Sequence, residues 1–239
     1  MDANNSFRAR RGFNWTSLGV LAACAALGTT AAAAPAPADW PSVGRDQGGQ
    51  RHSPLTQISP ANVGQLKETW VYHMQTDAAK AATAGRRSGS AGLRVSESIP
   101  LVIGGNMYLG TPYGRVVALE AATGKEKWVF EIPDGDTPSV RGVEYWKGEG
   151  KHPASIVFGT PMGRMYSINA ATGKPNPSFG EAGVVNLKTP EVMQTGMDKP
   201  YFLPSPPIVF KNLIITGAGM GEGPGGLASG PGPRGDTRA

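Results

Sequence analysis

The feature that most constrains this fold is a twelve-residue segment that occurs twice in the chain. Residues 114–125 read GRVVALEAATGK, and residues 163–174, which begin 49 positions later, read GRMYSINAATGK, so seven of the twelve positions are identical. A segment that recurs at this spacing indicates one structural unit used more than once. Because each such unit buries its faces against its neighbours, the chain is predicted to form a repeat architecture.

Short apolar strands separated by turn residues surround both copies of this segment. Around the first copy there are four predicted strands within about 35 residues, as in one blade of a β-propeller. Two more strands accompany the second copy, and a third unit begins with another pair. Ahead of these units, partial alternation at residues 66–74 predicts a strand centred on Trp70. The strands predicted for the three units are residues 98–103, 107–111, 115–119, 127–130, 155–160, 164–169, 207–210 and 213–216.

The composition agrees with an all-β fold made of many short strands. The chain contains 34 Gly and 21 Pro, only 17% of its residues are charged, and no long run has helical periodicity. The Gly and Pro content alone would also fit disorder, but disorder does not fit evenly spaced apolar strands. The net charge is +5, yet the basic residues are scattered among acidic ones, so we predict no nucleic-acid partner.

Residues 1–38 have the pattern of a secretion signal peptide, and residues 39–239 are the predicted mature domain. Three arginines near the N-terminus are followed by a mostly apolar stretch, residues 15–27, that is too short to span a membrane comfortably. Small residues then precede Asp39, as they do at a signal-peptide cleavage site. The predicted location of the protein is therefore periplasmic.

Three alternatives remain open for this leader. It could stay in place as a membrane anchor, and the pair Arg10-Arg11 weakly resembles a twin-arginine signal. The stretch LAAC, which ends at Cys24, resembles the lipobox of bacterial lipoproteins, and a lipid on Cys24 would associate the protein with a membrane. Cys24 is the only cysteine, so cleavage after residue 38 would leave no disulfide and no thiol chemistry.

Two predicted loops accompany the repeat: one that is rich in Ala, Gly, Ser and Arg precedes the first unit, and one that is rich in Gly and Pro lies in the third. Residues 77–94 have no apolar face and are predicted to form a mobile surface loop, and residues 217–235 form a Gly/Pro-rich loop in the third unit. Residues 236–239 stand where the next Thr-Gly-Lys turn would begin. Three units would leave one flank exposed, because only closure of the ring protects the terminal edges. We therefore expect the chain to be the N-terminal part of a longer propeller.

The element ALEAATGKEKW at residues 118–128 resembles the tryptophan-docking motif of dehydrogenases that use pyrroloquinoline quinone (PQQ). In that family an indole from a neighbouring blade stacks on the turn glycine and donates its N–H to a backbone acceptor. Residues 40–55 and 58–66 are similar to the mature N-terminus of the same family. The resemblance covers essentially all of residues 39–239 and implies a propeller of the eight-bladed quinoprotein type, with about its first three blades present.

The resemblance is closest to the glucose-dehydrogenase-like branch of the family. Members of the alcohol branch carry an adjacent cysteine pair shortly before the arginine that matches Arg141, whereas residues 135–140 contain no cysteine. The implied activity is oxidation of the hydroxyl of a sugar such as glucose. The alternatives are a PQQ alcohol dehydrogenase and a non-enzymatic propeller scaffold of the outer-membrane assembly type, and the latter needs no cofactor-binding residues such as Arg141 and Glu97.

The resemblance also implies which residues contact the cofactor. Arg141 matches the family arginine near the quinone oxygens, where a planar guanidinium can hold adjacent oxygens bidentately. Glu97 matches a cofactor-contacting glutamate at the start of a strand, and Thr160 matches a threonine that hydrogen-bonds PQQ. Gly219 and Gly221 belong to the stretch that replaces a Ser-Gly-Ala sequence touching the cofactor in the alcohol branch.

A metal ion completes the implied site. Glu222 aligns with the glutamate that binds Ca²⁺ in the alcohol branch, so the resemblance implies a Ca²⁺ (or Mg²⁺) ligand there. In the implied reaction the metal polarises the quinone carbonyl, a carboxylate base removes the hydroxyl proton of the sugar or alcohol, and hydride passes to the quinone. Reduced PQQ then gives its electrons to a respiratory acceptor, a quinone or cytochrome c. The family's catalytic Asp lies beyond residue 239, so we assign no catalytic residue and expect the isolated chain to be inactive.

Overall fold

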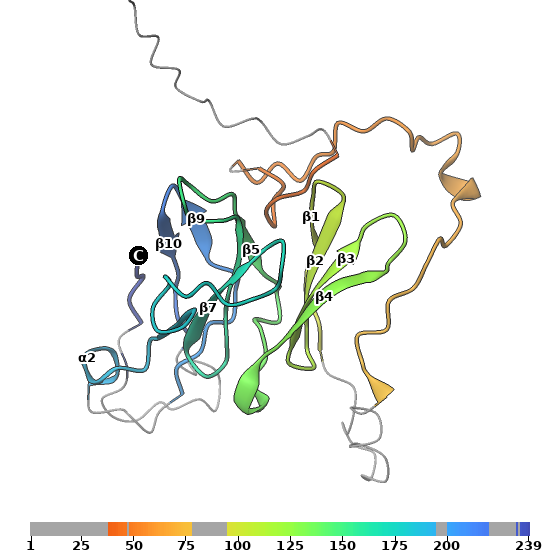
Figure 1. Ribbon diagram of the computed structural model, residues 1–239. Helices are drawn as coiled ribbons and strands as arrows, with labels where there is room; N and C mark the ends of the chain where they lie inside the picture. The colour runs from red at the N-terminus through yellow and green to blue at the C-terminus, as the bar shows by residue number, and fades with distance from the viewer. Residues whose placement is uncertain (1–37, 47, 78–94, 195–199, 220–232, 234) are drawn as a thin grey trace, which may run out of the picture. The chain divides into compact units, whose positions relative to one another are not determined.

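The computed structural model describes residues 38–46, 48–77, 95–194, 200–219, 233 and 235–239, all of which belong to one compact unit (Figure 1). The predicted signal peptide and the predicted surface loop at residues 77–94 fall almost entirely outside these ranges and stay predictions. Within the described ranges, no helix is long and apolar enough to cross a membrane.

Two four-stranded antiparallel sheets and one hairpin make up the described fold. The strands of each sheet follow one another in chain order, which is the arrangement of a propeller blade, and the all-β prediction is confirmed. Three single helical turns lie within the described ranges: η1 (Val63–Gln65), η2 (Pro133–Gly135) and α2 (Pro190–Met193). The first sheet contains β1 (Leu101–Ile103), β2 (Asn106–Thr111), β3 (Arg115–Glu120) and β4 (Glu126–Glu131). The second contains β5 (Glu144–Trp146), β6 (Ser155–Gly159), β7 (Arg164–Asn169) and β8 (Val184–Asn186), and the hairpin contains β9 (Ile208–Phe210) and β10 (Leu213–Ile215).

Two strands of the second sheet, β5 and β8, were not predicted from the sequence. Each is three residues long, which is too short for an alternating pattern to stand out. Pairing with longer neighbours defines them: Glu144 of β5 is opposite Val157 of β6, and Val184 of β8 is opposite Tyr166 of β7. The formation of β5 and β8, the two edge strands of this sheet, therefore depends on tertiary structure.

The predicted docking of indoles on turn glycines is confirmed twice. Trp70 lies against Gly124, and Trp128 lies against Gly173, so closely that an added Cβ would come within 2.5 and 2.6 Å of the respective indole rings. Both glycines have positive φ, at 71° and 70°. The indole N–H of Trp70 donates to the Ala121 carbonyl at 3.2 Å. The indole N–H of Trp128 donates at 3.0 Å to the Ala170 carbonyl, which lies 49 positions after Ala121. Each contact joins one unit to the segment that precedes it.

The prediction of a strand at residues 66–74 is wrong, although side chains of the segment do alternate between packed and exposed. No strand is assigned there, because no neighbouring strand offers this segment a hydrogen-bonded ladder among the described residues. The side chains of Trp70, Tyr72 and Met74 nevertheless pack against a buried cluster of the first sheet, whereas Val71 between them is 56% exposed. The segment is extended, and it covers the outer face of the first sheet.

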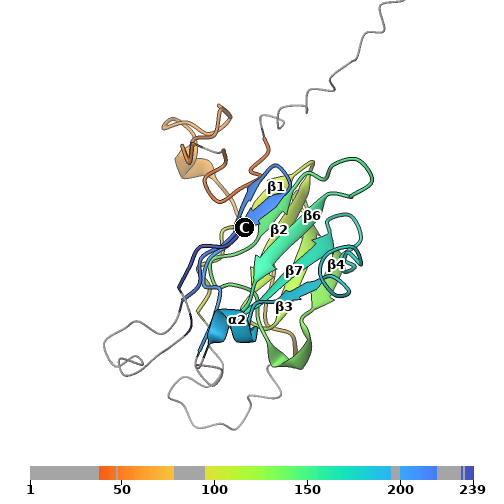
Figure 2. The same cartoon turned by 90° about the vertical axis from the view of Figure 1, so that its left-hand side faces the viewer.

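The first and second sheets lie face to face (Figure 2), and they share one apolar core. Side chains of β2 and β3 and side chains of β6 and β7 are fully buried in it. Phe158 stacks on Tyr166 with ring centroids 5.1 Å apart, and Phe130 of β4 lies 5.9 Å from Tyr166. Burying an aromatic side chain of this kind contributes on the order of 2 kcal/mol. The core therefore fixes the two sheets against each other and positions the loops at their ends.

A Thr–Arg pairing marks the same point in all three units. Thr111 at the end of β2 pairs with Arg115 at the start of β3, and the Thr160 N–H donates to the Arg164 carbonyl at 2.9 Å. In the third unit Thr216 and Arg238 exchange two backbone hydrogen bonds of 2.9 Å each. The third unit therefore repeats the register of the first two, although a longer connection separates its Thr from its Arg.

We expect an alanine at residue 124 to destabilise the chain more than an alanine at a glycine with open space around it. Both Gly124 and Gly104 have positive φ, but nothing lies within 4 Å of a Cβ on Gly104. Gly104→Ala should therefore cost about 1 kcal/mol of unfolding free energy from backbone strain alone. Gly124→Ala should cost an additional 1–3 kcal/mol, approximately, because its Cβ displaces the Trp70 indole. Urea unfolding, followed by tryptophan fluorescence, measures the unfolding free energy of both variants. Equal losses of unfolding free energy in the two variants would contradict the docking of Trp70 on Gly124.

A partly buried carboxyl on β5, that of Glu144, is expected to make the stability of the fold fall as pH rises. Burial raises the pKa of Glu144 from 4.5 to about 8, partly offset by a hydrogen bond from the Tyr145 backbone. Between these values the native state holds a proton that the unfolded state releases, so native stability is greatest below pH 4.5 and falls up to pH 8. The slope is on the order of 1 kcal/mol per pH unit.

Glu144→Gln keeps the shape of this side chain and removes its titration. Urea unfolding of the native sequence and of the variant at pH 5, 6, 7 and 8 compares the two slopes. We expect the unfolding free energy of the variant to depend much less on pH than that of the native chain. The variant should also be more stable than the native chain at pH 8. Parallel slopes for the two proteins would show that Glu144 is not the titrating group.

Candidate functional site

One polar residue stands just before the first strand of each unit. Glu97 lies four residues before β1, Arg141 three residues before β5, and Ser205 three residues before β9. All three residues lie in the segments that precede the first strands, and the structure brings their side chains together. Arg141 Nε lies 3.4 Å from Glu97 Oε2, and Arg141 Nη1 donates to Ser205 Oγ at 2.9 Å. Two residues singled out from the sequence are thus neighbours, and a third joins them.

Backbone contacts hold the segments that carry Glu97 and Arg141 side by side. The Glu97 N–H donates to the Val140 carbonyl at 2.9 Å, and Ile99 forms a parallel β-bridge with Gly142. Gly142 has φ of 113°, and a Cβ there would lie 3.2 Å from the Ile99 carbonyl oxygen. Only glycine allows this close approach in this conformation. The local sequence Arg-Gly therefore brings the guanidinium against the first unit.

The ion pair between Glu97 and Arg141 is open to solvent. Each side chain keeps 56% of its surface exposed. Exposed pairs of this kind contribute only about 0–1 kcal/mol to stability, so folding energy does not account for the arrangement. A cation with exposed N–H groups at the end of a sheet can instead bind an anionic or oxygen-rich ligand.

Besides Ser205, two further serines near Arg141 were missed by sequence reasoning. Ser139 is 2% exposed, and its hydroxyl donates to the Pro204 carbonyl at 2.7 Å and accepts from the Arg141 N–H at 3.3 Å. Ser98 Oγ is buried and has no hydrogen-bond partner among the described residues, and it lies 3.2 Å from the place a Cβ would take on Gly142. The only sequence signal for these serines was their position next to predicted site residues: Ser98 follows Glu97, and Ser139 lies two residues before Arg141.

Thr160 directly follows β6, and its hydroxyl is engaged in the β6–β7 turn. It is fully buried, and its Oγ1 accepts from the Arg164 N–H at 3.2 Å, which closes the β6–β7 turn. Its carbonyl accepts from the Leu203 N–H at 3.0 Å. No hydrogen bond joins it to Arg141 or Glu97 in the described part of the chain. Its assigned contact with PQQ stays a prediction.

The structure describes only part of the segment that is expected to bind the metal and the cofactor, residues 219–222. Gly219 exchanges two backbone hydrogen bonds with Phe202, at 3.1 and 2.8 Å, and a Cβ there would meet the Phe202 ring at 2.5 Å. Gly221 and Glu222 lie outside the described residues. Within the described ranges no group of three or more His, Cys, Asp or Glu side chains could hold a metal ion. The assignment of Glu222 as a metal ligand stays a prediction.

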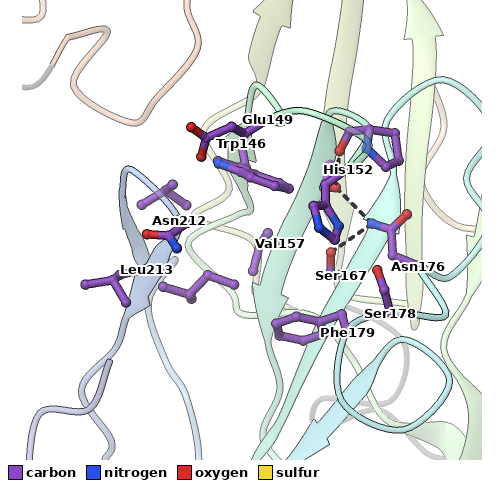
Figure 3. A pocket seen from close by; sticks show the side chains of 14 residues that line it. Trp146, Glu149, His152, Val157, Ser167, Asn176, Ser178, Phe179, Asn212 and Leu213 are labelled. Atoms are coloured by element: carbon purple, nitrogen blue, oxygen red, sulfur yellow. Dashed lines mark hydrogen bonds between the residues drawn. The ribbon is translucent and has the colours of Figure 1, made fainter.

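A cavity lies elsewhere, between the second sheet and the β9–β10 hairpin (Figure 3). Its volume is about 470 Å³, and Trp146, His152 and Asn212 line it. Trp146 ends β5, whereas Arg141 precedes β5, so the cavity and the Arg141 cluster lie toward opposite ends of the strand. The amide of Asn176 at its wall already donates to two serine hydroxyls, at 2.8 and 2.9 Å. We therefore place the candidate site at the Arg141 cluster.

Known proteins resemble this chain over most of its length. The family model "PQQ: Glucose/ethanol/alcohol dehydrogenase, beta-propeller domain" matches residues 40–239. The quinoprotein glucose dehydrogenase of Escherichia coli is 34% identical over 198 residues, which is 75% of this chain and 23% of that protein. The dehydrogenase subunit of a quinone-dependent alcohol dehydrogenase of Gluconobacter oxydans is 38% identical over 122 residues, which is 47% of this chain and 14% of that protein.

Two solved structures share the fold. A quinohemoprotein alcohol dehydrogenase of Pseudomonas putida HK5 aligns with a TM-score of 0.57 at 29% identity, over 78% of this chain and 23% of the other. A europium-containing methanol dehydrogenase aligns with a TM-score of 0.54 at 23% identity, over 78% of this chain and 28% of the other, and supports the fold alone. This chain spans about a quarter of these proteins. The match over residues 40–239, together with the paired blades and docked indoles, shows that the chain belongs to the β-propeller family of PQQ-dependent quinoprotein dehydrogenases.

Proposed function

We propose that this chain supplies one side of the PQQ pocket in a dehydrogenase that oxidises the hydroxyl of a sugar such as glucose. The observation that carries the proposal is the exposed Arg141 guanidinium held between Glu97 and Ser205. A glucose dehydrogenase that matches 75% of the chain supports a sugar substrate, as does the absence of cysteine from residues 135–140. Because the chain spans about a quarter of its relatives, the activity is proposed for the whole protein.

The Arg141 cluster fits the chemistry of PQQ. This cofactor is a planar tricarboxylate with quinone oxygens, and it needs cations and hydrogen-bond donors around its edge. The guanidinium of Arg141 can donate to two adjacent oxygens, and the buried Ser98 hydroxyl, without a partner among the described residues, offers a further donor or acceptor. When bound, PQQ supplies the acceptor for two electrons. Arg141 and Glu97 would bind its edge and orient it.

The remaining parts of the site follow from the same proposal. Glu222 would bind Ca²⁺ or Mg²⁺, a hard cation that prefers carboxylate oxygens. Thr160, Gly219 and Gly221 would line the cofactor on the same side. The signal peptide would direct the protein to the periplasm, or a lipid on Cys24 would anchor it there. A respiratory quinone or cytochrome c would accept the electrons.

Oxidation of a simple alcohol is the second candidate function. The observation that favours it is the 38% identity to the alcohol dehydrogenase subunit of Gluconobacter oxydans, which is higher than the identity to the glucose dehydrogenase but covers a shorter stretch. Residues that would choose between a sugar and an alcohol are expected in the parts of the relatives that this chain does not span.

We expect the 239-residue chain to reduce no dye with PQQ, Ca²⁺ and either glucose or ethanol, because we assign the family's catalytic Asp to a position beyond residue 239. The measurement is phenazine-coupled dye reduction by the purified chain. The E. coli glucose dehydrogenase serves as the positive control. Turnover above the protein-free rate would contradict the assignment of the base to a position beyond residue 239.

Replacing Arg141 should weaken PQQ binding in the same chain. Arg141→Lys keeps the charge but loses the planar fork, and we expect the dissociation constant for PQQ with Ca²⁺ to rise about tenfold. The measurement is a titration followed by PQQ absorbance. Arg164→Lys is the matched control, because it changes a surface arginine paired with Asp134 at 2.9 Å. If both variants bind as tightly as the native chain, Arg141 does not contact the cofactor.

A further inference from the structure

We propose that Ser205 is the positioning residue for Arg141, so that cofactor binding depends on the third unit being docked on the second. The inference rests on the proposed function, since it concerns how the PQQ-binding arginine is held. Ser205 was not singled out from the sequence. The contact that assigns its role is the 2.9 Å hydrogen bond from Arg141 Nη1 to Ser205 Oγ.

Arg141 needs a second contact to have a defined orientation. Its side chain is long and 56% exposed, and fixing such a side chain costs about 2 kcal/mol of rotamer entropy. Glu97 contacts only Nε, at 3.4 Å, and is equally exposed. A contact through Nε alone leaves the guanidinium free to swing about that point. The bond from Nη1 to Ser205 holds a second nitrogen, and two fixed nitrogens define the plane of the fork.

Ser205 is well suited to this role because its backbone is rigid. It lies in the sequence Pro204-Ser205-Pro206-Pro207, and each proline ring fixes one φ angle while also restricting the residue before it. The carbonyl of Pro204 accepts a hydrogen bond from the buried Ser139 hydroxyl at 2.7 Å. The Leu203 N–H donates to Thr160 at 3.0 Å. The hydroxyl is therefore presented from a fixed position next to the second unit.

The chemistry of a hydroxyl matters as much as its position. Glu97 partly cancels the charge of Arg141, whereas a neutral serine orients the guanidinium and leaves its positive charge intact. Ser139 links the two loops directly, because it accepts from the Arg141 N–H at 3.3 Å and donates to the Pro204 carbonyl. When the loop before β9 docks, it therefore orders the backbone of Arg141 through Ser139 and the side chain of Arg141 through Ser205.

The test compares Ser205→Ala with Ser205→Thr, which restores a hydroxyl. Ser178→Ala is the control, because Ser178 is an exposed serine at the rim of the cavity in Figure 3. The first readout needs no cofactor: the ¹⁵N heteronuclear NOE of the Arg141 Nε–Hε group, with its signal assigned by Arg141→Lys. The second readout is the dissociation constant for PQQ with Ca²⁺, and thermal unfolding of every variant verifies that it is folded.

We expect Ser205→Ala to lower the NOE of Arg141 and to raise the dissociation constant about 3- to 10-fold, which corresponds to one neutral hydrogen bond. Ser205→Thr should restore both values, and Ser178→Ala should change neither. An unchanged NOE in Ser205→Ala overturns the inference, and weaker binding with an unchanged NOE would assign Ser205 to direct cofactor contact instead. If the native chain binds no PQQ while Ser205→Ala still mobilises Arg141, the positioning contact stands and the proposed function fails.

Discussion

The contact on which the rest of this structure depends is an indole ring lying flat on a turn glycine. Trp70 and Trp128 each make it, and each donates its ring N–H to a backbone carbonyl three residues before that glycine. The contact needs glycine twice over, because the backbone has positive φ and the ring leaves no room for a Cβ. It fixes the distance between successive units at their outer turns, while the aromatic core around Phe158 and Tyr166 fixes them face to face.

The candidate site follows from that packing. Once two sheets are fixed against each other, the segments that precede their first strands lie side by side, and Gly142 lets them approach closely enough for Glu97 and Arg141 to meet. Ser205 arrives by the same rule from the third unit. The segments that precede the first strands of successive units therefore bring polar side chains from distant parts of the chain into one cluster. Arg141, which contacts both Glu97 and Ser205, is an oriented cation that can bind an oxygen-rich ligand.

Sequence reasoning reached most of the fold. The duplicated segment and its strands were predictable because alternation and turn glycines are local signals, and the indole docking followed from the family resemblance. Residues 66–74 show the limit: alternation correctly marked which side chains pack inward, but no neighbouring strand pairs with the segment among the described residues. Strands β5 and β8 were missed because three residues carry too little pattern. At the site, Glu97 and Arg141 were found by resemblance, whereas Ser139 and Ser205 were missed because an isolated serine carries no pattern.

The sequence by itself determined that this chain is a β-repeat with glycine turns that accept indoles, since twelve nearly repeated residues fix both spacing and conformation. Tertiary structure decided which polar residues form a cluster. Arg141 and Ser205 are far apart in the chain, and only the docking of one sheet on another places their side chains within a hydrogen bond. It also buried the Thr160 hydroxyl in the β6–β7 turn, where it accepts from the Arg164 N–H. Contacts between units depend on packing geometry, which no local pattern of residues encodes.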